Sequence, residues 1–123
     1  PPNMANDPQS IVEDATFDYT MGDTAVALEK LNALVKTHPD CFAAWHALTE
    51  IHYSQRAFSE ALEAAQTAHT IDPQDIHINT SLSRIHMELG DKDTAEHFGA
   101  KARTLGWKEQ LKEPEGGDGM EIG

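Results

Sequence analysis

Apolar residues recur along the chain at spacings of three and four, which is the period of an α-helix that buries one face. The clearest run contains Ala27, Leu28, Leu31, Leu34 and Val35 on one stripe. Comparable runs are separated by short segments that contain glycine, proline and aspartate. The pattern predicts six helices, at about 9–21, 24–37, 41–55, 58–71, 75–89 and 92–105.

The segments between these runs carry specific stop signals. Pro39 and Pro73 end the second and fourth helices, because the residue before a proline avoids helical backbone. Gly22 and Gly90 end the first and fifth, because glycine permits a left-handed C-terminal conformation. Asp23 then has the side chain expected at the start of the next helix. We therefore predict an all-α chain of helix hairpins.

A longer repetition lies over this pattern, because equivalent residues return every 34 positions. The matching sets are Ala27, Ala61 and Ala95; Leu34, Ala68 and Ala102; Pro39 and Pro73; and Leu48 and Leu82. The middle copy also has Trp45 at its start, and the Trp, Leu, Ala and Pro positions have the spacing of the tetratricopeptide repeat. The chain resembles that family over residues 8 to about 107.

The resemblance implies an α-solenoid of three antiparallel helix hairpins in a right-handed stack. The repeats would cover residues 8–41, 42–75 and 76–107, within a domain at 9–112. Trp107 and Leu111 are expected to form a short cap over the open end of the last hairpin. The polar lead at 1–8 and the acidic, glycine-rich tail at 113–123 are expected to be disordered.

Charge narrows the range of partners. The net charge is −12, which argues against nucleic acid and against an anionic membrane surface. It suits a protein or peptide partner, including a basic one. The N-terminal Pro-Pro-Asn-Met has no signal-peptide pattern, and no apolar run is long enough to span a membrane. With Cys41 as the sole cysteine we expect a cytoplasmic location, and the periplasm stays open.

No catalytic motif occurs in the sequence, so we predict a non-enzymatic protein with no cofactor and no metal site. A glycine-rich phosphate loop, a Gly-x-Ser-x-Gly sequence and a His-Glu-x-x-His sequence are all missing. Two minor alternatives remain among the seven histidines. One is a weak transition-metal site that involves His46 and His77. The other is a pH-sensitive layer at the position where the family usually has tyrosine, here Asp18, His52 and His86.

The resemblance also indicates where a partner would bind. In such repeats the first helix of each hairpin lines a concave face. The residues expected there are Val12, Thr16, Tyr19, His46, Glu50, Tyr53, His77, Thr80, Arg84 and Met87. Tyrosine and methionine offer adaptable apolar contacts, and Glu50 and Arg84 offer polar ones. We expect an adaptor or scaffold that binds a peptide or helix on this face. The alternative is a self-assembly module that forms a homo-oligomer.

Overall fold

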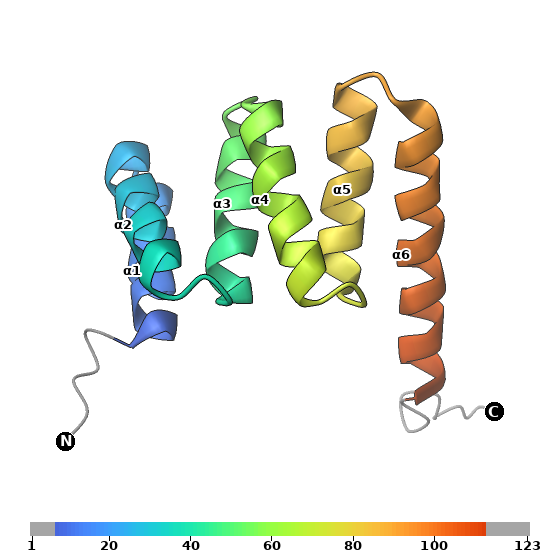
Figure 1. The fold of residues 1–123 in the computed structure, drawn as a ribbon, viewed down its shortest axis with the longest axis horizontal. Coiled ribbons are helices and arrows are strands. Elements are labelled where there is room, and N and C mark those ends of the chain that lie inside the picture. The colour runs from blue at the N-terminus through green and yellow to red at the C-terminus, as the bar shows by residue number, and fades with distance from the viewer. Residues whose placement is uncertain (1–6, 113–123) are drawn as a thin grey trace. The chain divides into compact units, whose positions relative to one another are not determined.

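The computed structural model describes residues 7–112, which form six helices and, over this range, no strand. The helices are α1 (Pro8–Thr20), α2 (Thr24–Thr37), α3 (Phe42–Ser54), α4 (Phe58–Ile71), α5 (Ile76–Glu88) and α6 (Lys92–Lys112) (Figure 1). The all-α prediction is confirmed. Pro8, which we assigned to the lead, is the first residue of α1. Asp7 is also described, as the cap of that helix, whereas residues 1–6 of the predicted lead and the tail at 113–123 lie outside the described residues.

The helices fall into two compact units, one with α1 to α4 and the other with α5 and α6. In the first unit α1 packs against α2, α3 packs against α4, and α3 also contacts both α1 and α2. The core there contains Leu31, Leu34, Leu48 and Ile51, each at most 4% exposed. In the second unit α5 and α6 form one hairpin. Its buried residues include Ile78, Leu82, Ile85 and Ala95.

Small residues fill the closest helix contacts. Ala27, Ala61 and Ala95 are 34 residues apart and each is fully buried. On α4 the inward stripe is alanine throughout, because Ala64, Ala65 and Ala68 follow Ala61 and all are buried. In the last hairpin Gly99 has a comparable role, since a Cβ there would lie 3.1 Å from Ser83 Oγ. Side chains with little or no volume thus let two helices approach closely.

The three hairpin turns share one backbone geometry. Each has a hydrogen bond from the residue after the turn to a carbonyl five residues earlier, at 2.8–2.9 Å: Asp23 to Asp18, Ala57 to His52, and Asp91 to His86. Each also has one residue with a positive φ, namely Gly22, Arg56 and Gly90. This is the glycine-type helix ending that the sequence predicts. Arg56 adopts it without being glycine, at a φ of 61°.

Aspartates cap several of the helices. The Asp7 carboxylate accepts a hydrogen bond from Ser10 N at 3.3 Å, and Asp75 accepts one from Ile78 N at 2.8 Å. Asp91 accepts bonds from both the backbone N–H and the hydroxyl of Thr94, which lower the pKa of its carboxyl. The expected cap by Asp23 is wrong, because its side chain makes no capping bond.

Helix α6 differs most from the prediction. It has 21 residues and continues through Gly106 to Lys112, whereas we expected it to end at 105. One interior glycine costs a helix about 1 kcal/mol, and the lysine, glutamate, glutamine and leucine that follow are good helix formers. Because α5 has only 13 residues, the last turns of α6 extend past its hairpin partner (Figure 1).

The predicted cap is wrong for the same reason, because those last turns have no helix of the same hairpin beside them. Trp107 is 63% exposed and Leu111 is 66% exposed. Phe17 and Leu89 are also exposed, at 63% and 45%. For Phe17 the cause is its position, because no described helix precedes α1 and covers that face.

Enlarging a buried alanine tests the close contacts. Ala61→Leu should lower the free energy of unfolding by about 1–3 kcal/mol, because the added atoms overfill a tight helix contact. Gln66→Leu on the exposed side of the same helix should change stability little. Urea denaturation followed by circular dichroism would measure both, and equal stability of the two variants would show that the α3–α4 contact is not tight.

The left-handed turn residue gives a second prediction. Arg56→Ala should destabilise the fold, because it keeps the strained backbone and removes the guanidinium that lies 5.1 Å from the centre of the Phe58 ring. Arg56→Gly should be more stable than Arg56→Ala by about 1–2 kcal/mol, since glycine adopts a positive φ without strain. Equilibrium denaturation would compare the two.

The adjacent Gln55 is the control, because its φ is −85°. There the order should reverse, and Gln55→Gly should be less stable than Gln55→Ala. The same order at both positions would contradict the account of the turn.

Candidate functional site

A hollow of about 300 Å³ lies between α1 and α3, within the first unit. Two helical stripes face each other across it. On α1 the lining residues are four and then three positions apart. On α3 they are three, one, three and one positions apart. Both sets of spacings keep the residues on one face of their helix. The lining residues are Val12, Thr16, Tyr19, Ala43, His46, Ala47, Glu50 and Ile51.

The floor of the hollow is apolar and belongs to the core. Val12 is 8% exposed and Ile51 is 4% exposed, and both are members of the buried cluster of the first unit. Ala43 and Ala47 pack against that cluster and are one turn apart on α3. Because alanine side chains are short, they leave space between the two helices. The hollow therefore follows from small residues at these two positions.

The rim is polar, and its α1 side is held by hydrogen bonds. The Thr16 hydroxyl donates to the Val12 carbonyl at 2.8 Å, which fixes that side chain against its own helix. The Tyr19 hydroxyl forms a hydrogen bond with the Ser54 hydroxyl at the end of α3. Tyr19 therefore joins the two helices at one end of the hollow while its ring remains half-buried.

Across the rim, α3 contributes an acid and an imidazole. His46 Nε2 lies 3.7 Å from Glu50 Oε2, four residues along the helix. This separation is too long for a hydrogen bond, so the pair acts only through charge when the imidazole is protonated. The His46 ring also stacks on Phe42 at a centroid distance of 5.9 Å. Such a partly exposed pair contributes about 1 kcal/mol at most, and a ligand can displace it at little cost.

The structure brings together five of the ten predicted site residues: Val12, Thr16, Tyr19, His46 and Glu50. Tyr53 is not part of the lining and packs edge-on against Phe58, at 5.5 Å between ring centres. His77, Thr80, Arg84 and Met87 belong to α5 in the second unit, and their role stays a prediction. The other three lining residues, Ala43, Ala47 and Ile51, were not predicted, although two alanines four apart between larger residues are a visible sign of space.

The repeat position that the family usually fills with tyrosine holds Asp18, His52 and His86 in this chain. The structure gives clear surroundings for two of these three side chains. Asp18 Oδ2 lies 2.6 Å from Lys30 Nζ, and this bond to the carboxylate holds the pKa of Lys30 above its usual value. His86 stacks almost parallel on Phe98, with ring centres 5.7 Å apart. The first is an ion pair within a hairpin and the second a ring contact, so the shared position has no single function.

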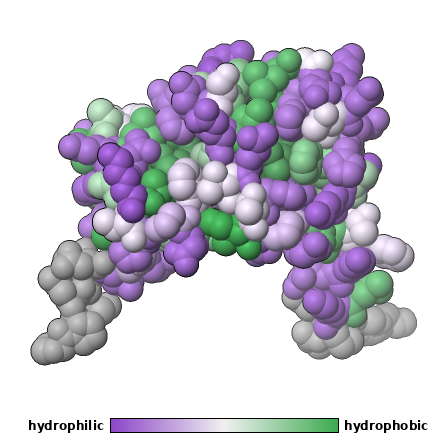
Figure 2. Space-filling view, viewed as in Figure 1, coloured by the Kyte–Doolittle hydropathy of each residue, from purple (hydrophilic) through white to green (hydrophobic). Residues whose placement is uncertain are grey.

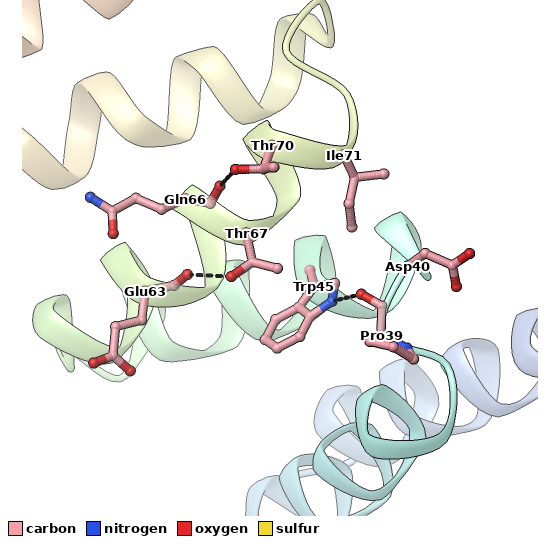
Figure 3. A pocket seen from close by; sticks show the side chains of 8 residues that line it. All are labelled: Pro39, Asp40, Trp45, Glu63, Gln66, Thr67, Thr70 and Ile71. Carbon is pink, nitrogen blue, oxygen red and sulfur yellow. Dashed lines mark hydrogen bonds between the residues drawn. The ribbon is translucent and has the colours of Figure 1, made fainter.

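A second hollow, of about 780 Å³, lies beside Trp45, Pro39 and the outer side of α4 (Figure 3). The indole N–H of Trp45 donates to the Pro39 carbonyl at 2.8 Å. The hydroxyls of Thr67 and Thr70 donate to carbonyls of their own helix. These bonds leave the polar groups of Trp45, Thr67 and Thr70 partnered. Trp45 thus has a structural role, because it fastens the turn between the first two hairpins.

Residues 7–112 contain neither a metal-binding cluster nor a membrane-spanning helix. In that range no group of three or more histidine, cysteine, aspartate or glutamate side chains is arranged to hold a metal ion. None of the six described helices combines the length and the apolar character needed to cross a membrane.

Known proteins resemble the chain in two ways. Residues 18–76 match the family model described as tetratricopeptide repeat. A solved structure, the MamA RS-1 ArsTM double mutant, is similar at 21% sequence identity with a TM-score of 0.76. That alignment covers 85% of this chain and 58% of the other, and at this identity it concerns the fold alone. No curated protein matches the chain.

The matched segment includes α2, α3 and α4, which contain the most complete copy of the 34-residue pattern. The similar solved structure supports the same all-α arrangement of helix hairpins over most of the chain. The sequence period and the family match agree over residues 18–76, so this segment is similar to the tetratricopeptide repeat, and the described residues form an all-α fold of helix hairpins.

Proposed function

We propose that this protein is a non-enzymatic interaction module whose α1–α3 hollow binds a short segment of a protein partner. The observation that carries the proposal is the convergence of Val12, Thr16, Tyr19, His46 and Glu50 around one hollow. These residues come from two repeats. Members of this repeat family generally mediate protein–protein interactions, and that general role is the starting point for the finer statement.

The dimensions of the hollow favour a side chain of a peptide or helix as the ligand. A volume of about 300 Å³ is at the lower end of the range for sites that enclose whole small molecules. The floor of Val12 and Ile51 suits an aliphatic or aromatic group, whose burial there removes apolar surface from water. The rest of the partner segment would lie along the two helices, where the hydroxyls and Glu50 can contact its backbone or polar groups.

Charge favours a partner segment with a basic residue near its apolar anchor. Glu50 stands at the rim, and the whole chain has a net charge of −12. Complementary charge increases the association rate more than it increases affinity, and salt weakens the effect. The apolar anchor would thus supply most of the binding energy, while Glu50 would contribute to orientation and encounter.

Filling the hollow tests the proposal. Thr16→Arg places a long side chain at the exposed rim without removing a core contact, and should abolish capture of a specific partner in pull-downs. Thr20→Arg is the matched control, because Thr20 is also exposed on α1, makes the same kind of hydroxyl-to-carbonyl bond, and does not line the hollow. Calorimetric titration of each captured partner should show at least about a tenfold loss of affinity, or 1.4 kcal/mol, for Thr16→Arg alone.

The result that would contradict the proposal is equal binding by both variants. Equal loss in both would instead indicate damage to α1, which circular dichroism would detect. As a further check, Glu50→Gln should slow association and reduce its salt dependence, with a small effect on affinity at high salt.

A further inference from the structure

The last turns of α6 present a basic and partly apolar surface that the α1–α3 hollow does not use. Trp107 and Leu111 are 63% and 66% exposed and are four residues apart, so they share one face of the helix. Arg103 is exposed and precedes Trp107 by four residues. Residues 101–112 contain four cations and one carboxylate, although the whole chain has a net charge of −12.

The outer surface of α1 has the same arrangement with the opposite charge. Phe17 and Met21 are each 63% exposed and are also four residues apart. Glu13 is exposed and precedes Phe17 by four residues. Asp14 is exposed on the same helix, which contains no lysine or arginine, whereas Asp18 is paired with Lys30 of α2. The same order therefore occurs twice: a charged residue, then an aromatic residue, then another apolar residue, each four positions after the last. The charged residue is acidic in the α1 series and basic in the α6 series.

The position of Phe17 is one that the other repeats bury. Its equivalents 34 residues apart are Ile51, at 4% exposure, and Ile85, at 0%. In the first unit α3 is covered by α1 and α2, and Ile51 belongs to the core cluster with α1 residues. No described helix covers the corresponding face of α1. The repeat pattern thus indicates that this face of α1 is suited to receive another helix.

The rest of the visible surface is largely polar. In Figure 2 hydrophilic residues predominate on the face shown, and hydrophobic residues occur in small separate areas. The two apolar pairs are the most exposed large apolar side chains of the described residues, at 63–66%, compared with 43–53% for Val26, Leu89 and Met87. Exposed apolar surface rimmed by charge commonly marks a protein contact.

We infer that the end of α6 in one copy docks on the outer face of α1 in a second copy. Trp107 and Leu111 pack against the apolar pair of α1. Arg103 lies beside Glu13, so the charges on the two faces are paired. The contact is heterologous, because the two copies contribute different surfaces, and the pair as a whole retains one free surface of each kind. The inference does not rest on the function proposed for the α1–α3 hollow.

The experiment uses two full-length variants, each with one surface blocked. Phe17→Glu blocks the α1 face and leaves α6 intact, whereas Trp107→Glu blocks α6 and leaves α1 intact. By light scattering, the unchanged protein should gain mass as its concentration rises to about 1 mM, where small interfaces become populated. Each variant alone should remain monomeric. An equimolar mixture should form a 1:1 dimer and nothing larger, because only one complementary pair remains.

A charge exchange provides an independent check with milder substitutions. Glu13→Arg and Arg103→Glu should each weaken self-association, and the chain with both changes should regain it. Lys92→Glu at the start of α6 is the control for the change in net charge and should retain association at the level of the unchanged protein. Association should also weaken between about 50 and 500 mM salt, because the paired charges are exposed.

Three results would overturn the inference. The first is a monomer at every concentration, and the second is a mixture of the two blocked variants that stays monomeric. The third is binding to phosphatidylserine-containing vesicles that Trp107→Glu abolishes, without any self-association of the unchanged protein. That result would assign the basic end of α6 to an anionic lipid surface instead.

Discussion

The close contact between the two helices of each hairpin is the constraint on which the rest of the structure depends. Ala27, Ala61 and Ala95 are completely buried at equivalent positions, and a larger side chain at any of them would push two helices apart. This requirement, repeated every 34 residues, accounts for the sequence period. Between the first two hairpins, where α1 faces α3, the short side chains of Ala43 and Ala47 line a hollow.

Much of the fold could be predicted because its signals are local. Pro39 and Pro73 mark two helix ends through backbone sterics, and Gly22 and Gly90 mark two turns through their positive φ. The remaining turn contains Arg56 in place of a glycine, and it lies between the predicted helices at 41–55 and 58–71. The 3.6-residue period likewise located the buried stripe of α2, which packs against both α1 and α3.

The failures occur where burial depends on what lies beyond the hairpin. Phe17 has the pattern of an inward residue, but the side chain is exposed because no described helix covers that face of α1. Trp107 and Leu111 have the composition of a cap, but α6 continues as a helix past the end of α5 and carries them outward. The α1–α3 hollow could be predicted only in part, because the period gives the face of each helix, and not the space left between two helices.

The central claim is that the α1–α3 hollow is the surface that binds a partner. The most direct test is a titration of the isotopically labelled protein with a partner-derived peptide, followed residue by residue through backbone amide resonances. The account predicts that the largest changes occur at Thr16, Ala43, Ala47 and Ile51. Changes centred on Trp45, Thr67 and Thr70, beside the larger hollow on α4, would contradict it.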